Sequence, residues 1–315
     1  MALVGCTTVT TMTAAQVTQR NAENTRVKTL LIAQGDARSL MTAALLASSW
    51  APGPPPLKRI ADPDQWALAQ RATALAPKDR ALAWAKVALC ARSSGCDDLG
   101  TARQFRAIDP ANAAGWLPDL AAAAKHSTAA VTAVLTAMSR TTAFNLYFNQ
   151  RVVEIADAYQ QIGTTPTYRH SPGAMARLFA AGGLVAAQPV PALQELARAC
   201  DEVHPDRNQA CEAILATMAR GDEDLIQSLA AEITIRRDAP DDPGRIAAQR
   251  LLRTSAWQEH LLGPIESAPF ALNRRAAERL RLMALLPTED EVTRALLRRH
   301  HRPLEPPAQW RPATG

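Results

Sequence analysis

Five cysteines are the residues with the most distinctive chemistry in this chain of 315 residues. Cys90 and Cys96 flank one short polar stretch, and Cys200 and Cys211 flank another; each stretch separates two apolar runs with helical spacing. Two antiparallel helices joined by a short turn bring their facing ends within the Cα separation of about 4.4–6.8 Å that a disulfide requires. We therefore predict the disulfides Cys90–Cys96 and Cys200–Cys211, with Cys6 left over.

The same thiols have two other interpretations. Cys200, His204 and Cys211 could ligate zinc, but they supply only three ligands at an unusual spacing. In a reducing cytosol, the cysteines would instead be small buried apolar residues, whereas two bridges are stable in an oxidising compartment. We expect disulfides, no metal and no cofactor.

Cys6 ends the stretch Leu3-Val4-Gly5-Cys6, and a threonine-rich segment follows it. This stretch resembles the lipobox of bacterial lipoproteins, in which the cysteine receives the lipid. The resemblance implies lipidation of Cys6 and a polar tether, and Thr7 after the cysteine implies the outer membrane. A signal peptide needs a basic start and an apolar region of about 7–15 residues, so the resemblance implies a start upstream of Met1. The alternative is a chance match in a terminal segment with one free thiol.

Glu266 lies in PIESAPFALNRR, which resembles the start of a lytic transglycosylase catalytic domain, where a glutamate is the general acid. Pro269 interrupts the motif, and Glu278 and Leu280 replace its downstream glycines. Too little chain follows Glu266 to enclose a sugar and raise the pKa of that carboxyl. We therefore expect no catalytic residue and keep this enzyme as a remote alternative.

Two clusters could bind a partner. The first is aromatic, in a chain with only 4% aromatic residues, and the second is basic. Aromatic side chains are frequent anchors at interfaces, although such a cluster is also typical of a core. The basic cluster could contact an acidic partner, or it could be a solvated helix end whose cations suit the helix dipole. The clusters are Phe144, Tyr147 and Phe148, and Arg298 and Arg299 followed by two histidines.

Composition predicts an all-helical protein. Apolar residues make up 47% of the chain and many are alanine, while Ala, Leu, Arg, Gln and Glu are strong helix formers. In residues 222–233, Leu225, Leu229 and Ile233 recur every four positions. Thr288 offers an N-cap, and Pro243 suits a first helical turn. A net charge of +5 without a clustered patch argues against nucleic acid, and no run is long enough to span a membrane.

The helices divide into segments at breaker-rich stretches. We expect a lipobox and tether at 1–12, an N-terminal helical segment at 13–49, helical repeats at 57–163, helical hairpins at 171–301 and a loosely held, proline-rich tail at 302–315. One long helix is expected over residues 141–163.

Residues 63–140 contain a repeated pattern. Pro77 and Pro110 lie 33 positions apart, and Trp84 and Trp116 lie 32 apart. This period resembles that of tetratricopeptide-type repeats, which are close to 34 residues long. Leu120 and Ala121 lie where the family prefers Leu and Gly, whereas Ala123 takes the place of its usual Tyr. The resemblance implies an α-solenoid of stacked helical hairpins; the alternative is an irregular helical bundle.

These observations predict a non-enzymatic helical-repeat protein of the bacterial cell envelope that binds a protein or peptide partner in a preformed groove. It would contact the membrane only through a lipid anchor, as a periplasmic outer-membrane lipoprotein. Three alternatives remain: an immunity-type lipoprotein that inhibits a toxin, a cytosolic tetratricopeptide adaptor with free thiols, and the transglycosylase-like enzyme.

Overall fold

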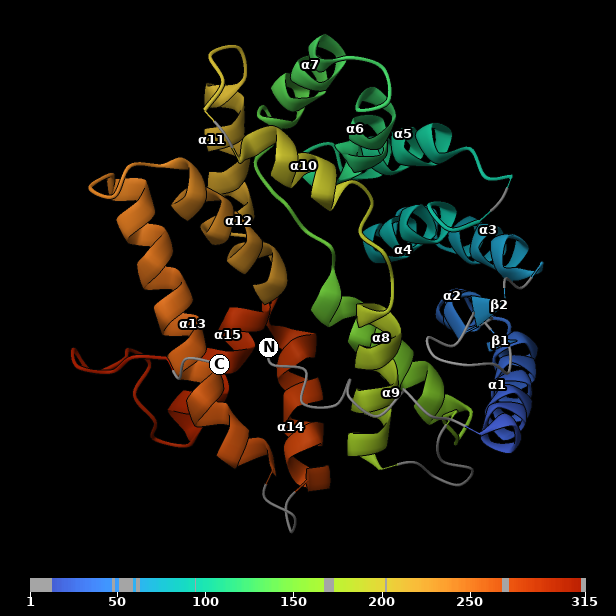
Figure 1. Ribbon diagram of the computed structural model, residues 1–315. Coiled ribbons are helices and arrows are strands. Elements are labelled where there is room, and N and C mark those ends of the chain that lie inside the picture. The colour runs from blue at the N-terminus through green and yellow to red at the C-terminus, as the bar shows by residue number, and fades with distance from the viewer. Residues whose placement is uncertain are drawn as a thin grey trace. The chain divides into compact units, whose positions relative to one another are not determined.

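The computed structural model describes residues 13–46, 49–50, 59–60, 63–93, 95–166, 173–201, 203–267 and 272–312. Over these ranges the fold is almost entirely helical (Figure 1). Two strands of two residues each, β1 (Ser49–Trp50) and β2 (Arg59–Ile60), form one antiparallel pair. The prediction of an all-helical fold is confirmed.

The chain forms two compact units, and each is built from two separate stretches of sequence. Unit 1 contains residues 1–97 and 150–189, and unit 2 contains residues 98–149 and 190–315. The segments expected from the sequence were contiguous, but the contacts divide residues 57–163 between both units. The partition follows packing and not chain order.

Unit 1 is a small helical assembly around α2 (Ala37–Leu46), which packs against α1 (Ala14–Gln34) and α3 (Gln65–Leu75). Every residue of α2 from Ser39 to Leu46 is buried, so this helix forms the centre of the unit. Three more helices complete the unit: α4 (Arg80–Cys90), most of α8 (Phe148–Gln161), and α9 (Ala174–Ala186).

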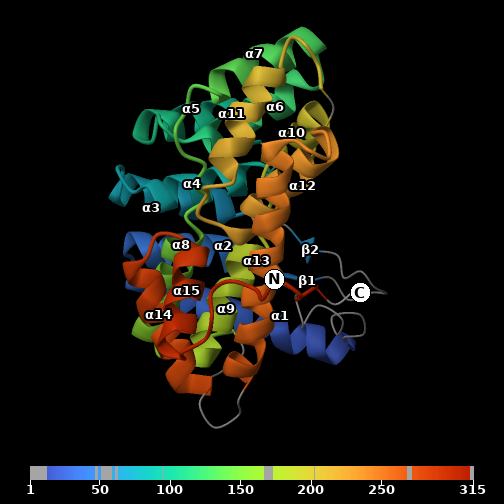
Figure 2. The same cartoon turned by 90° about the vertical axis from the view of Figure 1, so that its left-hand side faces the viewer.

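Unit 2 holds the remaining helices. They are α5 (Asp98–Ile108), the 3-10 helix η2 (Ala113–Trp116), α6 (Leu117–Ala123), α7 (Thr128–Met138), α10 (Leu193–Cys200), α11 (Asn208–Met218), α12 (Asp224–Arg237), α13 (Pro243–Ser267), α14 (Leu272–Leu285) and α15 (Glu289–Arg299). Within this unit, α12 packs against α13, and α15 packs against both α13 and α14. Figure 2 shows α6 and α7 beside α11, and the direct contact of α7 with α11 agrees with that view.

Helix starts follow the local chemistry that the sequence predicts. Thr288 caps α15 by accepting the N–H of Glu291, and the Glu291 side chain accepts the N–H of Thr288 in return, which forms a capping box. α13 begins at Pro243, where a missing N–H costs nothing. Asp79 caps α4 by accepting the N–H of Leu82.

The long helix expected over residues 141–163 is shorter than predicted. α8 begins only at Phe148, and residues 142–147 form an irregular segment. Tyr147 has a φ of 58°, a left-handed conformation that cannot continue a helix. Buried polar side chains of unit 2 hold this segment, as the next section describes.

Gly115 allows α5 and η2 to approach closely. A Cβ at this position would lie 2.8 Å from Cγ of Arg106 and 2.9 Å from Cδ1 of Phe105. The Arg106 guanidinium stacks on the Trp116 ring at 4.1 Å, donates to the Gly115 carbonyl at 2.7 Å and pairs with Asp119. These contacts join α5 to η2 and α6 in one hairpin.

Candidate functional site: a polar cleft and the adjoining tail

A polar cleft of about 510 Å³ lies in unit 2, where α12, α13 and α15 meet. Its walls carry side chains of both charges, together with hydroxyl and amide groups. The positive side chains are Arg220, Arg250 and Arg294, and the negative side chains are Asp224, Glu259, Asp290, Glu291 and Glu305. The volume falls in the usual range for small-ligand sites, and most of the residues that line the cleft are charged or polar.

Hydrogen bonds join the N-termini of α12 and α15 beside the cleft. The buried carboxylate of Glu289 accepts the N–H of Asp224 at 3.0 Å, and the N–H of Glu289 donates to the carbonyl of Asp222 at 3.0 Å. Arg294 pairs with Asp290 at 2.8 Å on the adjoining turn of α15. The two helices therefore keep a defined separation at this end.

Burial changes the titration of these acids. It raises the pKa of Glu289 to about 8, and the nearby carboxylate of Asp224 adds to the rise. Burial also raises the pKa of Asp224, and the neighbouring Asp290 contributes. Glu289 therefore binds a proton near neutral pH, where an ordinary glutamate is ionised.

The C-terminal segment 302–312 borders the cleft through Glu305 and lies along α13. Trp257 donates its indole N–H to the carbonyl of Pro303 at 3.2 Å, and Gln258 donates to the carbonyl of Leu304 at 3.2 Å. The expectation of a loosely held tail is wrong, because side chains of α13 donate hydrogen bonds to backbone carbonyls of the tail.

Asp222 holds the irregular segment before α8. Its carboxylate accepts the N–H of Leu146 at 2.8 Å and that of Tyr147 at 2.6 Å. Burial raises the pKa of Asp222 to about 6, although these backbone bonds oppose the rise. No local sequence signal identified Asp222, because its partners lie about 75 positions earlier in the chain.

Asn112 holds the same segment from the other side. It accepts the N–H of Asn145 and donates to the Asn145 carbonyl, while the Tyr147 hydroxyl donates to Asp109. Phe144 is fully buried and Phe148 is nearly so. Phe144 and Phe148 therefore belong to the core, the alternative to partner binding given above, whereas Tyr147 is half-buried.

The basic cluster lies at the end of α15. Arg298 and Arg299 occupy the last turn, where cations suit the helix dipole. Arg299 also pairs with Glu278 of α14 at 2.5 Å. These contacts match the interpretation of a solvated helix end. Neither arginine lines the cleft.

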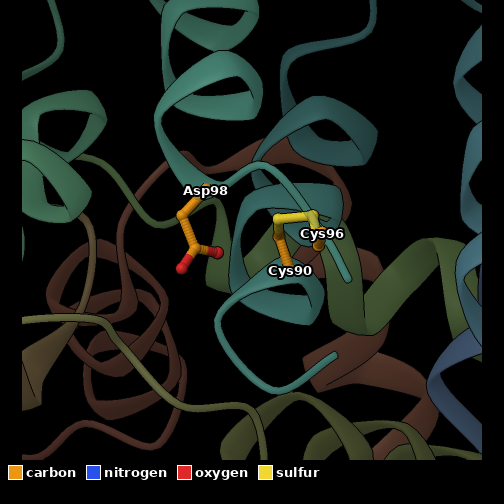
Figure 3. A group of neighbouring side chains, drawn as sticks. All are labelled: Cys90, Cys96 and Asp98. Atoms are coloured by element: carbon orange, nitrogen blue, oxygen red, sulfur yellow. A yellow bond between two sulfur atoms is a disulfide. The ribbon is translucent and has the colours of Figure 1, made fainter. Parts of the chain in front are cut away.

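The structure contains both expected cysteine pairs. Cα atoms are 5.5 Å apart in Cys90–Cys96 and 5.4 Å apart in Cys200–Cys211. Figure 3 shows the first bridge and Asp98, two residues further along the chain. Bonded sulfurs are not thiolate ligands, so neither this group nor the alternative zinc set of Cys200, His204 and Cys211 is a metal site while the bridges persist.

The sequence also drew attention to Cys6 and Glu266. Cys6 lies outside the described residues. Glu266 belongs to the last turn of α13, in a helix that continues through Pro264 to Ser267. In the ranges that the structure describes, no helix combines the length and the apolar character needed to cross a bilayer.

Comparisons with known proteins found no relative of this chain. No family model, no curated protein and no solved structure matches this chain. The cleft and its surroundings are therefore interpreted from their own chemistry.

Proposed function

We propose that this protein is a non-enzymatic binding protein of the bacterial cell envelope that captures a segment of a partner protein in the polar cleft of unit 2. The observation that carries the proposal is the cleft itself. It is large enough for several residues of an extended chain, and its walls present arginines and carboxylates together. A peptide carries both charges and many backbone donors and acceptors, so this lining suits a peptide better than an apolar ligand.

The tail on α13 supports capture of an extended chain. The side chains of α13 bind residues 303–310 mainly through backbone carbonyls, the groups that any peptide offers. Trp257 is also in contact with the aromatic ring of Trp310. The protein thus already holds one extended segment at the edge of the cleft.

The two disulfides support export to an oxidising compartment, since such bridges are rare in the cytosol. With the lipobox resemblance, they favour a periplasmic protein that is anchored to the outer membrane through a lipid on Cys6.

Helix spacing supports a degenerate repeat. α3 begins at Gln65 and α5 at Asp98, while α4 begins at Arg80 and η2 at Ala113, so both pairs of starts are 33 positions apart. We propose that these hairpins are divergent tetratricopeptide-like units.

Site-specific photocrosslinking in the native host tests the binding proposal. A photoreactive aromatic residue would replace Arg250, which lines the cleft, or Ile246, which is exposed on the same helix outside it. We expect a covalent adduct with one defined peptide sequence at position 250 and none at position 246. Charge reversal with Arg220→Glu, made in the position-250 variant, should reduce that adduct severalfold, whereas Arg220→Lys should not. Equal adducts at both positions, or none at either, would rule out the cleft as the binding site.

A further inference from the structure

Side chains of α13 hold residues 303–310 of the tail, although the tail follows α15 in the chain. Arg253 donates to the carbonyls of Pro307, Ala308 and Trp310, and Trp257 and Gln258 bind the carbonyls of Pro303 and Leu304. The Trp310 ring packs edge-on against Trp257 at 5.3 Å and lies 6.4 Å from His260. The tail therefore has a complete binding surface on α13, and this surface does not depend on which chain supplies the tail.

A short connection joins α15 to the docked tail. Only residues 300–302 separate Arg299, the end of α15, from Pro303, the first docked residue. His301 donates to Arg298 and Arg302 donates to Leu297, which is the Schellman pattern of a helix C-terminus.

His301 occupies the position of this motif that usually belongs to glycine. Its φ is 53°, in the left-handed region where a residue with a Cβ is disfavoured. The closed connection therefore has a conformational cost that an open, extended connection would not have. Opening also releases two backbone bonds, whose donors His301 and Arg302 are exposed to water. Leu297, which accepts the N–H of Arg302, is buried, but its carbonyl also accepts the N–H of His300.

We propose that the tail exchanges between two copies of this chain, so that residues 303–310 of each copy dock on α13 of the other. A short connection under strain favours such domain swapping, and the exchange rebuilds every tail contact without a new interface. Glu305 lines the cleft, so in the exchanged dimer each cleft receives this carboxylate from the partner copy.

Sedimentation of the full chain tests the role of the connection, with Cys6→Ser present so that intermolecular disulfides through Cys6 cannot form. We expect His301→Gly to weaken dimerisation about tenfold or more, because glycine adopts the closed conformation without cost. His301→Val should strengthen it by a similar factor, because a β-branched residue is poorly tolerated at positive φ. The matched control is His300→Val, since the φ of His300 is −96° and any residue adopts it; this variant should dimerise like the parent.

Isotope mixing tests the exchange directly and does not depend on the stability of those variants. A photoreactive aromatic residue replaces Trp310 in unlabelled and in ¹⁵N-labelled chains. The two are mixed, unfolded with their disulfides intact, refolded together and irradiated. Crosslinks between the tail and α13 should include mixed-isotope pairs, approaching half of all pairs in the dimer fraction. Only same-isotope pairs, with or without a dimer, would overturn the proposal and leave the tail as an intramolecular segment.

Discussion

The carboxylate of Asp222 accepts the backbone N–H of Tyr147 at 2.6 Å, across 75 positions of sequence. The same carboxylate accepts the N–H of Leu146, so one buried side chain satisfies two backbone donors that lie just before the first residue of α8. This relationship holds Tyr147 at a positive φ and determines where α8 begins.

Asp222→Asn should destabilise unit 2 by about 1–3 kcal/mol, because an amide oxygen can accept only one of the two N–H groups and its NH₂ faces the other. Denaturant unfolding would measure the loss, and hydrogen exchange at residues 142–148 would localise it. Asp241→Asn is the matched control, since Asp241 is exposed. Unchanged exchange in residues 142–148 would contradict the assigned role of Asp222.

Stability should decrease as pH rises. Burial raises the pKa of Asp222 from 3.8 to about 6, that of Glu154 in unit 1 from 4.5 to about 7, and that of Glu289 from 4.5 to about 8. Each folded group binds its proton more tightly than the unfolded group, so its stabilising effect is complete below about pH 4 and is lost as pH rises through the folded pKa.

Denaturant midpoints at pH 5 and pH 8.5 check this pH dependence. For Asp222 alone, the raised pKa corresponds to roughly 3 kcal/mol over the full titration, of which about 1.4 kcal/mol is lost between pH 5 and pH 8.5. We expect a lower midpoint at pH 8.5 and a smaller difference in Glu289→Gln, because glutamine can still accept the N–H of Asp224 but does not titrate. A midpoint that rises between pH 5 and pH 8.5 would contradict the burial of these acids.

Two glycine substitutions should have opposite effects. Gly115→Ala places a Cβ within 3 Å of Arg106 and Phe105 and should destabilise the protein by about 1–3 kcal/mol. Gly183→Ala adds a Cβ in open space within α9 and should stabilise it by roughly 0.5–1 kcal/mol. Thermal unfolding of both variants would measure the difference. A Gly115→Ala variant as stable as the parent would argue against the close approach of α5 and η2.

Reduction should increase the intact mass by about four daltons, two hydrogens for each bridge. Protein taken from unbroken cells and alkylated without reductant should carry no label at Cys90, Cys96, Cys200 or Cys211. The Cys200→Ala/Cys211→Ala variant should lose about 2–5 kcal/mol of stability. Labelling of all four cysteines in cells would exclude the proposed oxidising compartment.

The hydrophobic periodicity was sufficient to predict helices, but it did not predict which face of every helix is buried. Leu225 was expected on the buried face of α12, yet it is 62% exposed, while Ile226, Ala230 and Ile233 are buried. A period of 3.6 residues fits either set, and only the positions of α11 and α13 select one of them.

The sequence alone determined the features that depend on near neighbours: helices rich in alanine and leucine, the N-cap at Thr288, the proline that begins α13, and cysteines placed to bridge across short turns. Each of these depends on interactions between residues no more than about a dozen positions apart. The tertiary structure decided the rest, namely the Asp222 contact to residues 146–147, the cleft among α12, α13 and α15, and the tail on α13. Those contacts join distant positions, and their partners are chosen by packing and by the need to satisfy buried polar groups, which no local pattern records.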